Sequence, residues 1–188
     1  MYQHHPFRRN FVRALPALFL AALVLPNVTA VSAQAPDPLR NPAIDMEGYL
    51  KVSREAAQHR ATRRVTEADF MRMSSEPNTI VLDARSLAKY NELHVKGAKH
   101  LNFSDITIDS LAQLIPDKNT RVLIYCNNNF RNAESPFPMK MVTASLNLST
   151  YIALYNYGYR NVYELGPLID FKQSKLPFES NEASPRNG

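Results

Sequence analysis

The stretch Arg121-Val-Leu-Ile-Tyr-Cys-Asn-Asn-Asn-Phe-Arg131 decides the fold, because an apolar run carries the only cysteine, Cys126, into a polar loop. Residues 121–125 are β-branched or aromatic for the most part and follow the turn-forming residues 116–119, which predicts a fully buried central strand. Three asparagines then end the strand in a tight loop, since asparagine readily bonds its own main chain. A thiol at the carboxyl end of such a strand lies where open α/β sheets bind ligands.

Cys126 itself has two interpretations. Cysteine is among the most buried residue types, so a structural role in the core is one of them. The residues directly after Cys126 are polar, however, and Arg131 is close enough along the chain to stabilise a thiolate. These two features favour a reactive thiol.

Strands and helices are expected to alternate around this stretch. Short apolar runs bounded by turn residues predict strands at 79–82, 97–103, 121–125 and 161–165. Capping residues and helical spacing predict helices at 66–74, 86–92, 110–115 and 143–157. The alternation predicts an α/β fold with a mostly parallel central sheet and helices on both faces.

The first 33 residues predict an export signal. Residues 1–13 hold three arginines and no acid, residues 14–25 are almost wholly apolar but too short to span a bilayer, and Val31-Ser32-Ala33 is a suitable cleavage site. The Arg8-Arg9 pair also resembles a twin-arginine signal, so this route stays open beside the favoured general secretory route. We therefore expect an exported protein, periplasmic or secreted, with no stable membrane insertion after signal removal.

Charge and cysteine content limit the partners. The chain has 22 basic and 17 acidic residues, a net charge of +5. Removal of residues 1–33 takes away three arginines and no acid, which lowers the net charge to +2. Nucleic-acid binding needs a clustered basic footprint, so none is expected. A single cysteine in an oxidising compartment forms no intrachain disulfide.

The remaining chain divides into four segments. Residues 34–43 hold three prolines and are expected to form an extended tether, followed by an accessory helix at 44–64. The domain proper covers 65–180, and 181–188 form a flexible tail. The basic residues of the accessory helix indicate a solvated face, with a binding patch as the alternative; they are Arg54, His59, Arg60, Arg63 and Arg64.

Five motifs, including the cysteine stretch, follow one another along the chain. They are IVLDARS at 80–86, HVKGAKHLNF at 94–103, LIYCNNNFR at 123–131, YGYRNVYELGP at 157–167 and LPFE at 176–179. With them, residues 65 to about 179 resemble the rhodanese (thiosulfate sulfurtransferase) domain, in a single-domain exported form.

The resemblance implies a sulfurtransferase in which Cys126 carries a persulfide. It implies a small anionic sulfur donor such as thiosulfate and a thiol or cyanide acceptor, with no cofactor. The residues implied to bind substrate are Asn127, Asn128, Asn129, Phe130 and Arg131. The alternative is a non-catalytic rhodanese-fold module that binds a partner or carries sulfur. Four residues separate cysteine and arginine, as in the sulfur-transferring members, which disfavours the phosphatases with a longer loop.

Other polar residues are expected to play supporting roles. Asp83 and Arg85 match family positions that support the active loop, and a plain buried ion pair or a helix cap is equally compatible with them. His94 resembles a family position that is structural, which favours that role over a catalytic one. No metal is expected, since the other histidines lack partners at metal-ligand spacing. Aromatic packing, rather than a ligand cage, is expected for Tyr151, Tyr155, Tyr157 and Tyr159.

The sequence departs from the family pattern at two places. Asn129 stands where the family often has glycine, and asparagine can take positive φ. Residues 132–142, with Pro136 and Pro138, delay a helix that in the family begins directly after the arginine to about Thr143. We expect this segment to form a surface flap beside the cysteine.

Overall fold

The structure is a computed structural model that describes residues 39–133 and 135–182. The predicted export signal, half of the predicted tether and most of the predicted tail lie outside these residues. Residues 39–41 are exposed, and a compact unit begins at Pro42. In the described ranges, no helix has the length and apolar character needed to cross a membrane.

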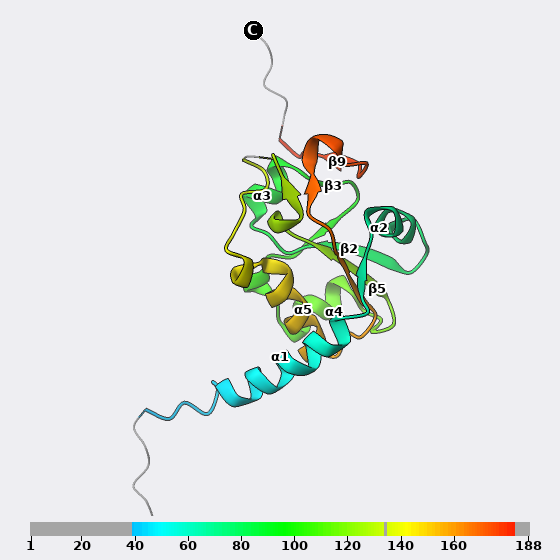
Figure 1. Cartoon of the computed structure of the whole chain (residues 1–188). Helices are drawn as coiled ribbons and strands as arrows, with labels where there is room; N and C mark the ends of the chain where they lie inside the picture. The colour runs from blue at the N-terminus through cyan, green and yellow to red at the C-terminus, as the bar shows by residue number, and fades with distance from the viewer. Residues whose placement is uncertain (1–38, 134, 183–188) are drawn as a thin grey trace, which may run out of the picture. The chain divides into compact units, whose positions relative to one another are not determined.

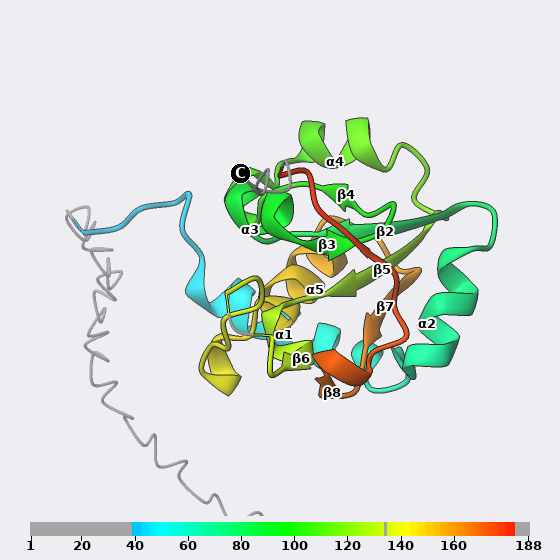
Figure 2. The same ribbon diagram turned by 90° about the horizontal axis from the view of Figure 1, so that it is seen from above.

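A five-stranded parallel sheet forms the centre of the compact unit (Figure 2). Every strand pair in it is parallel, and the strand at 121–125 lies in the middle, between the strands at 79–83 and 162–165. In spatial order the strands are β1 (Arg64–Val65), β7 (Val162–Leu165), β5 (Arg121–Tyr125), β2 (Thr79–Asp83) and β4 (Lys99–His100). The predicted mostly parallel sheet is therefore confirmed.

Helices cover both faces of this sheet (Figure 1). One face packs against α1 (Met46–Arg60), α4 (Ile108–Leu114) and α5 (Leu146–Asn156). The other face packs against α2 (Glu67–Ser74) and α3 (Leu87–Glu92). The short 3₁₀ turns are η1 (Phe103–Asp105), η2 (Asn127–Asn129), η3 (Val142–Ala144) and η4 (Phe171–Gln173).

The central strand β5 contributes side chains to both layers of the core, because successive side chains of a strand point to opposite faces. Val122 and Ile124 pack with the α4 and α5 layer, where Tyr151 also lies. Leu123 and Tyr125 pack on the other side with Phe70 of α2. A strand buried on both faces reads as a continuous apolar run, which explains the sequence of β5.

Side-chain caps set the starts of α1 to α4, and Asp45 caps α1 by accepting a hydrogen bond from the Gly48 amide. Thr66 accepts a hydrogen bond from the Asp69 amide and starts α2, and Ser86 does the same for α3. Thr107 forms a capping box with Ser110, so α4 begins two residues earlier than the sequence pattern predicted. Of the tyrosines predicted to pack in the core, Tyr151 and Tyr159 are buried in it, and Tyr155 and Tyr157 pack against it while partly exposed.

Two small sheets flank the central one. Strand β3 (His94–Val95) pairs antiparallel with β9 (Phe178–Glu179) (Figure 1). Strand β6 (Phe130–Arg131) pairs parallel with β8 (Ile169–Asp170) (Figure 2). The β6–β8 pair was not predicted. It matters for function because β6 follows the cysteine loop directly.

Helix α1 is bound to the domain through its basic C-terminal end. His59 Nδ1 lies 2.8 Å from the Tyr151 hydroxyl, and the guanidinium of Arg60 binds the carboxylate of Glu164 on β7. Burial, and then the charges of Arg63 and Arg160, lower the pKa of His59. The predicted solvated basic face is thus wrong for His59 and Arg60, because the domain supplies partners that the helix alone does not have.

Candidate active site

Cys126 lies at the carboxyl end of the central strand. Strands β2 and β7 end beside it, with Asp83 opposite Tyr125 and Glu164 opposite Ile124. The cysteine is only 1% exposed, yet it lines a cavity of about 380 Å³. Its position matches the ligand-binding edge of open α/β sheets.

Asn129 holds the turn that follows the cysteine. Its side-chain oxygen accepts hydrogen bonds from the Cys126 amide at 2.9 Å and from Asn147 Nδ2 at 3.0 Å, and its Nδ2 donates to the Leu165 carbonyl at 2.7 Å. Glycine-like freedom is not needed here, because Asn129 has a negative φ and lies in a 3₁₀ turn. The buried amide therefore fixes the loop by hydrogen bonding.

The first turn of α5 also reaches the thiol. Ser145 is the N-cap of α5, but its side chain makes no capping bond; its Oγ lies 3.4 Å from Cys126 Sγ. The start of α5 therefore lies beside the sulfur, and a helix N-terminus favours negative charge nearby. The delayed helix start does not remove the helix from the cysteine.

The segment 132–142 lies beside Cys126, as predicted. Met139 and Val142 line the same cavity as the thiol and are exposed. The sequence pattern did not indicate that Phe137 is fully buried among the aromatic residues of the core. The segment is thus a flap with a buried anchor.

A second contact joins the flap to the loop. The Asn128 side chain donates to the Lys140 carbonyl at 2.8 Å and accepts from the Lys140 amide at 3.1 Å. Such a pair of bonds imitates one step of a β-ladder. Asn128 lines the Cys126 cavity, so this contact forms part of its wall.

Two residues expected to bind substrate lie elsewhere. Phe130 is fully buried in the aromatic cluster, and Arg131 is exposed, with its Nε 4.0 Å from the Asp170 carboxylate. Neither residue lines the cavity of Cys126. The reason is β6: consecutive strand residues point to opposite sides, so burial of Phe130 turns Arg131 to the solvent.

Asn127 faces a different hollow. It is buried and lines a second cavity of about 390 Å³ together with Arg85, Lys89 and Lys140. Within the described residues, its side-chain oxygen has no hydrogen-bond partner. Of the expected loop residues, Cys126, Asn128 and Asn129 therefore share one cavity and Asn127 lines the other.

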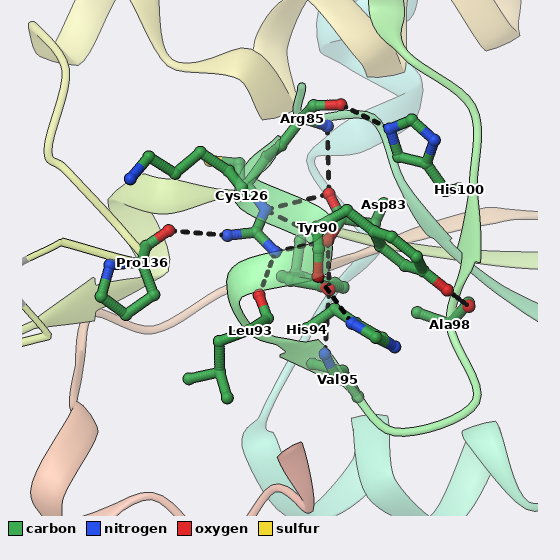
Figure 3. A network of polar contacts seen from close by, with 12 residues as sticks. Asp83, Arg85, Tyr90, Leu93, His94, Val95, Ala98, His100, Cys126 and Pro136 are labelled. Carbon is green, nitrogen blue, oxygen red and sulfur yellow. Dashed lines mark hydrogen bonds and ion pairs between the residues drawn. The ribbon is translucent and has the colours of Figure 1, made fainter. Parts of the chain in front are cut away.

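A buried polar network supports the loop from β2 (Figure 3). The Asp83 carboxylate binds the Arg85 guanidinium, with Nη2 at 2.6 Å, and accepts a hydrogen bond from the Tyr125 hydroxyl at 2.5 Å. The same hydroxyl accepts from the Val95 amide at 3.0 Å. Burial, and then the charge of Asp83, raise the pKa of Tyr125 well above its usual range, so the phenol stays a proton donor.

Arg85 connects this network to the flap. Its Nη1 donates to the Pro136 carbonyl at 2.8 Å and its Nη2 to the Leu93 carbonyl at 2.6 Å (Figure 3). Asp83 and Arg85 thus form a buried ion pair that also holds the segment beside Cys126. The pair does not line the Cys126 cavity, so its role is support.

The histidines of this region make structural contacts. His94 is buried, stacks on Tyr90 with 3.8 Å between ring centroids, and places Nδ1 2.7 Å from the Tyr90 carbonyl. His100 Nε2 lies 2.9 Å from the Arg85 carbonyl. The structural role expected of His94 agrees with this packing.

Comparison with known proteins identifies the family. The family model of the rhodanese-like domain matches residues 66–165, from the cap of α2 to the end of β7, more than half of the chain. The chain belongs to this family. The matched residues include the Asp83–Arg85 pair, the strand that leads to Cys126 and the loop at 126–131. The match ends at the last residue of β7, directly after Glu164.

Several solved structures resemble this rhodanese-like protein. A Bacillus halodurans protein is 21% identical, with 68% of this chain and 86% of that chain covered and a TM-score of 0.47. A rhodanese with anions from E. coli is 24% identical, with 54% of this chain and 98% of that chain covered and a TM-score of 0.38. A thiosulfate sulfurtransferase from Pseudomonas aeruginosa is 18% identical, with 72% of this chain and 23% of that chain covered and a TM-score of 0.48. No curated protein matches the chain.

Proposed function

We propose that this rhodanese-like protein is a sulfurtransferase that moves a sulfane sulfur through a persulfide on Cys126. The observation that carries the proposal is the position of the thiol, in a cavity at the end of the central strand and facing Ser145 at the start of α5. The helix N-terminus and the serine hydroxyl both favour an anionic sulfur at this position. A thiolate is the form of cysteine that acts as a nucleophile.

In the proposed reaction the Cys126 thiolate attacks the outer sulfur of a donor such as thiosulfate. The S–S bond of the donor breaks, and sulfite leaves with the bonding electron pair. The product is a Cys126 persulfide anion. A thiolate or cyanide then attacks the outer sulfur of the persulfide, takes it as a persulfide or thiocyanate, and returns the Cys126 thiolate.

Mass spectrometry tests this reaction directly. We expect the purified protein to gain one sulfur atom on treatment with thiosulfate and to lose it on addition of cyanide. Cys126→Ser should show no gain. An unchanged mass of the wild-type protein under an excess of thiosulfate would reject the sulfurtransferase proposal.

A second candidate function is a non-catalytic module that binds a partner. It is favoured by the 1% exposure of Cys126 and by the orientation of Arg131 away from the thiol. The two candidates differ in the reactivity of the thiol, because fold alone does not fix function. For the module we expect Cys126 to react with iodoacetamide no faster than a cysteine in an unfolded peptide.

We also propose that the protein acts outside the cytoplasm, because residues 1–33 have the pattern of an export signal. Fractionation of cells that express the full chain, with N-terminal sequencing of the mature form, tests this. Cleavage after Ala33 and recovery outside the cytoplasm are expected. An uncleaved chain in the cytoplasm would contradict it.

A further inference from the structure

The proposed donor is an anion, and Arg131 does not face the cavity that would receive it. The charged residues that do line the Cys126 cavity come from other elements. They are Arg60 from α1, Arg64 from β1 and Glu164 from β7. An anionic ligand needs a cation of this set that no carboxylate neutralises.

Arg60 is already neutralised by a carboxylate. Its guanidinium forms two parallel bonds to Glu164, of which the Nη2–Oε1 distance is 2.7 Å. Glu164 is buried, so it depends on this cation for compensation of its charge. The pair therefore adds no net charge to the cavity wall.

Arg64 is not neutralised in this way. Its side chain makes one hydrogen bond, from Nη2 to the Gly166 carbonyl at 2.9 Å, and in the described part of the chain no carboxylate lies within ion-pair distance of it. The residue is exposed, so the rest of its guanidinium is open to a ligand. A planar guanidinium with several N–H donors suits the oxygen atoms of a small oxyanion.

The backbone fixes Arg64 at the cavity. Strand β1 pairs with the edge of β7, with Arg64 opposite Glu164. A Cβ atom at Gly166 would lie 3.2 Å from the Val65 carbonyl and 3.4 Å from Arg64 Cβ, so the glycine permits this close approach. The position of Arg64 is thus set by sheet pairing and does not depend on a mobile loop.

We propose that Arg64 holds the anionic group of the sulfur donor in the Cys126 cavity. The donor class is a small thiosulfate- or thiosulfonate-like anion, whose oxygen atoms bind the guanidinium while its outer sulfur faces Cys126. This inference rests on the proposed sulfurtransferase function and deepens it. Arg64 lies before residues 66–165, so the cation comes from a segment outside the part matched by the family model.

Alkylation of Cys126 by two reagents of equal shape tests the proposal without sulfur transfer. Iodoacetate carries a carboxylate, whereas iodoacetamide is neutral. The measured quantity is the ratio of the rate constant for iodoacetate to that for iodoacetamide on the full chain. This ratio reports the attraction of an anion to the thiol, because a change in thiol reactivity affects both rate constants equally. We expect Arg64→Gln to lower this ratio by roughly threefold to fivefold, as for a partly exposed charge pair.

Three variants serve as matched controls. Arg64→Lys keeps the charge and should retain most of the ratio, whereas Arg131→Gln removes an equal charge that faces away and should leave it unchanged. Lys140→Gln probes the other cavity and should also leave the ratio unchanged. A ratio unaffected by Arg64→Gln, or lowered by Arg131→Gln or Lys140→Gln instead, would overturn the proposal.

The thiosulfate reaction then separates this proposal from the proposed function. With Arg64→Gln, persulfide formation should slow at low thiosulfate while iodoacetamide reactivity and the melting temperature stay near those of the wild type. If the wild type forms no persulfide, the sulfurtransferase function fails, and the alkylation ratio still decides whether Arg64 attracts anions to the cavity. If the wild type forms persulfide and Arg64→Gln does so at the same rate, the role of Arg64 fails alone.

Discussion

The hydroxyl oxygen of Ser145 lies 3.4 Å from the sulfur of Cys126, although 19 positions separate the two residues in the chain. The serine is the N-cap of α5, yet its side chain is directed to the thiol instead of the helix amides. The flap between them lets the helix start late in the sequence and still reach the loop. This contact makes Ser145 part of the candidate active site.

Replacement of Ser145 by alanine should slow the reaction of Cys126 with iodoacetamide near neutral pH. In the proposed reaction the hydroxyl donates a hydrogen bond to the thiolate, so its removal should cost about 1 kcal/mol, which is roughly fivefold in rate. Ser145→Thr keeps the hydroxyl and should react at nearly the wild-type rate. Equal rates for Ser145→Ala and the wild type would show that the hydroxyl does not act on the sulfur.

Asp83→Asn should destabilise the protein strongly. The change leaves the buried Arg85 guanidinium without its countercharge, and breaking such a pair from one side costs about 3 kcal/mol or more. Urea unfolding monitored by circular dichroism measures the loss. Tyr125→Phe removes only the phenol hydrogen bonds and should cost less, about 1–2 kcal/mol. If both variants cost the same, the charge of the pair contributes little.

The flap should depend on its aromatic anchor. Phe137→Ala empties a fully buried site between Phe130 and Phe178 and should lower the free energy of unfolding by about 3 kcal/mol. Phe137→Leu keeps most of the volume and should cost about 1 kcal/mol. Chemical denaturation of both variants provides the measurement. A cost near zero for Phe137→Ala would mean that the flap is not anchored in solution.

Asn128→Ala should loosen the flap without unfolding the domain. The variant removes the acceptor of the Lys140 amide, so hydrogen exchange at this amide should become roughly fivefold faster. Amides of β5 should exchange as in the wild type, because they belong to the buried centre of the sheet. Hydrogen-exchange mass spectrometry resolves the two regions. Equal exchange at Lys140 in both proteins would contradict a flap held by this contact.

His59 should make the protein less stable in mild acid. Its pKa is lowered in the folded state, so as the pH falls through about 6.5 the unfolded chain binds a proton that the folded chain resists. Stability from this residue is therefore present above that pH and decreases below it. The pKa values of carboxylates such as Glu76 and Glu179 are lowered in the folded state, so their contribution to stability is lost only as the pH falls below about 4.5.

Thermal unfolding at about pH 7.5 and pH 5.5 measures this effect. The wild type should melt at a lower temperature in the more acidic buffer, and His59→Gln should show a smaller difference. A variant with the same difference as the wild type would assign the acid sensitivity to other groups.

Local patterns in the sequence were sufficient for the α/β class, the parallel sheet and the position of Cys126. The run at 121–125 is apolar on both faces, which is typical of a central strand under two helical layers. Capping residues such as Thr66 and Ser86 likewise mark helix starts through short-range hydrogen bonds. These features depend on neighbours within a few residues, so the sequence by itself determined them.

The tertiary structure alone decided which side chains surround the thiol. Arg131 is five positions from Cys126 but points to solvent, because the β6–β8 pairing buries Phe130. Ser145 and Arg64 are distant in sequence and reach the cavity through a folded flap and a strand pairing. Long-range pairing of strands and burial of Phe137 set these positions, and no local pattern contains that information.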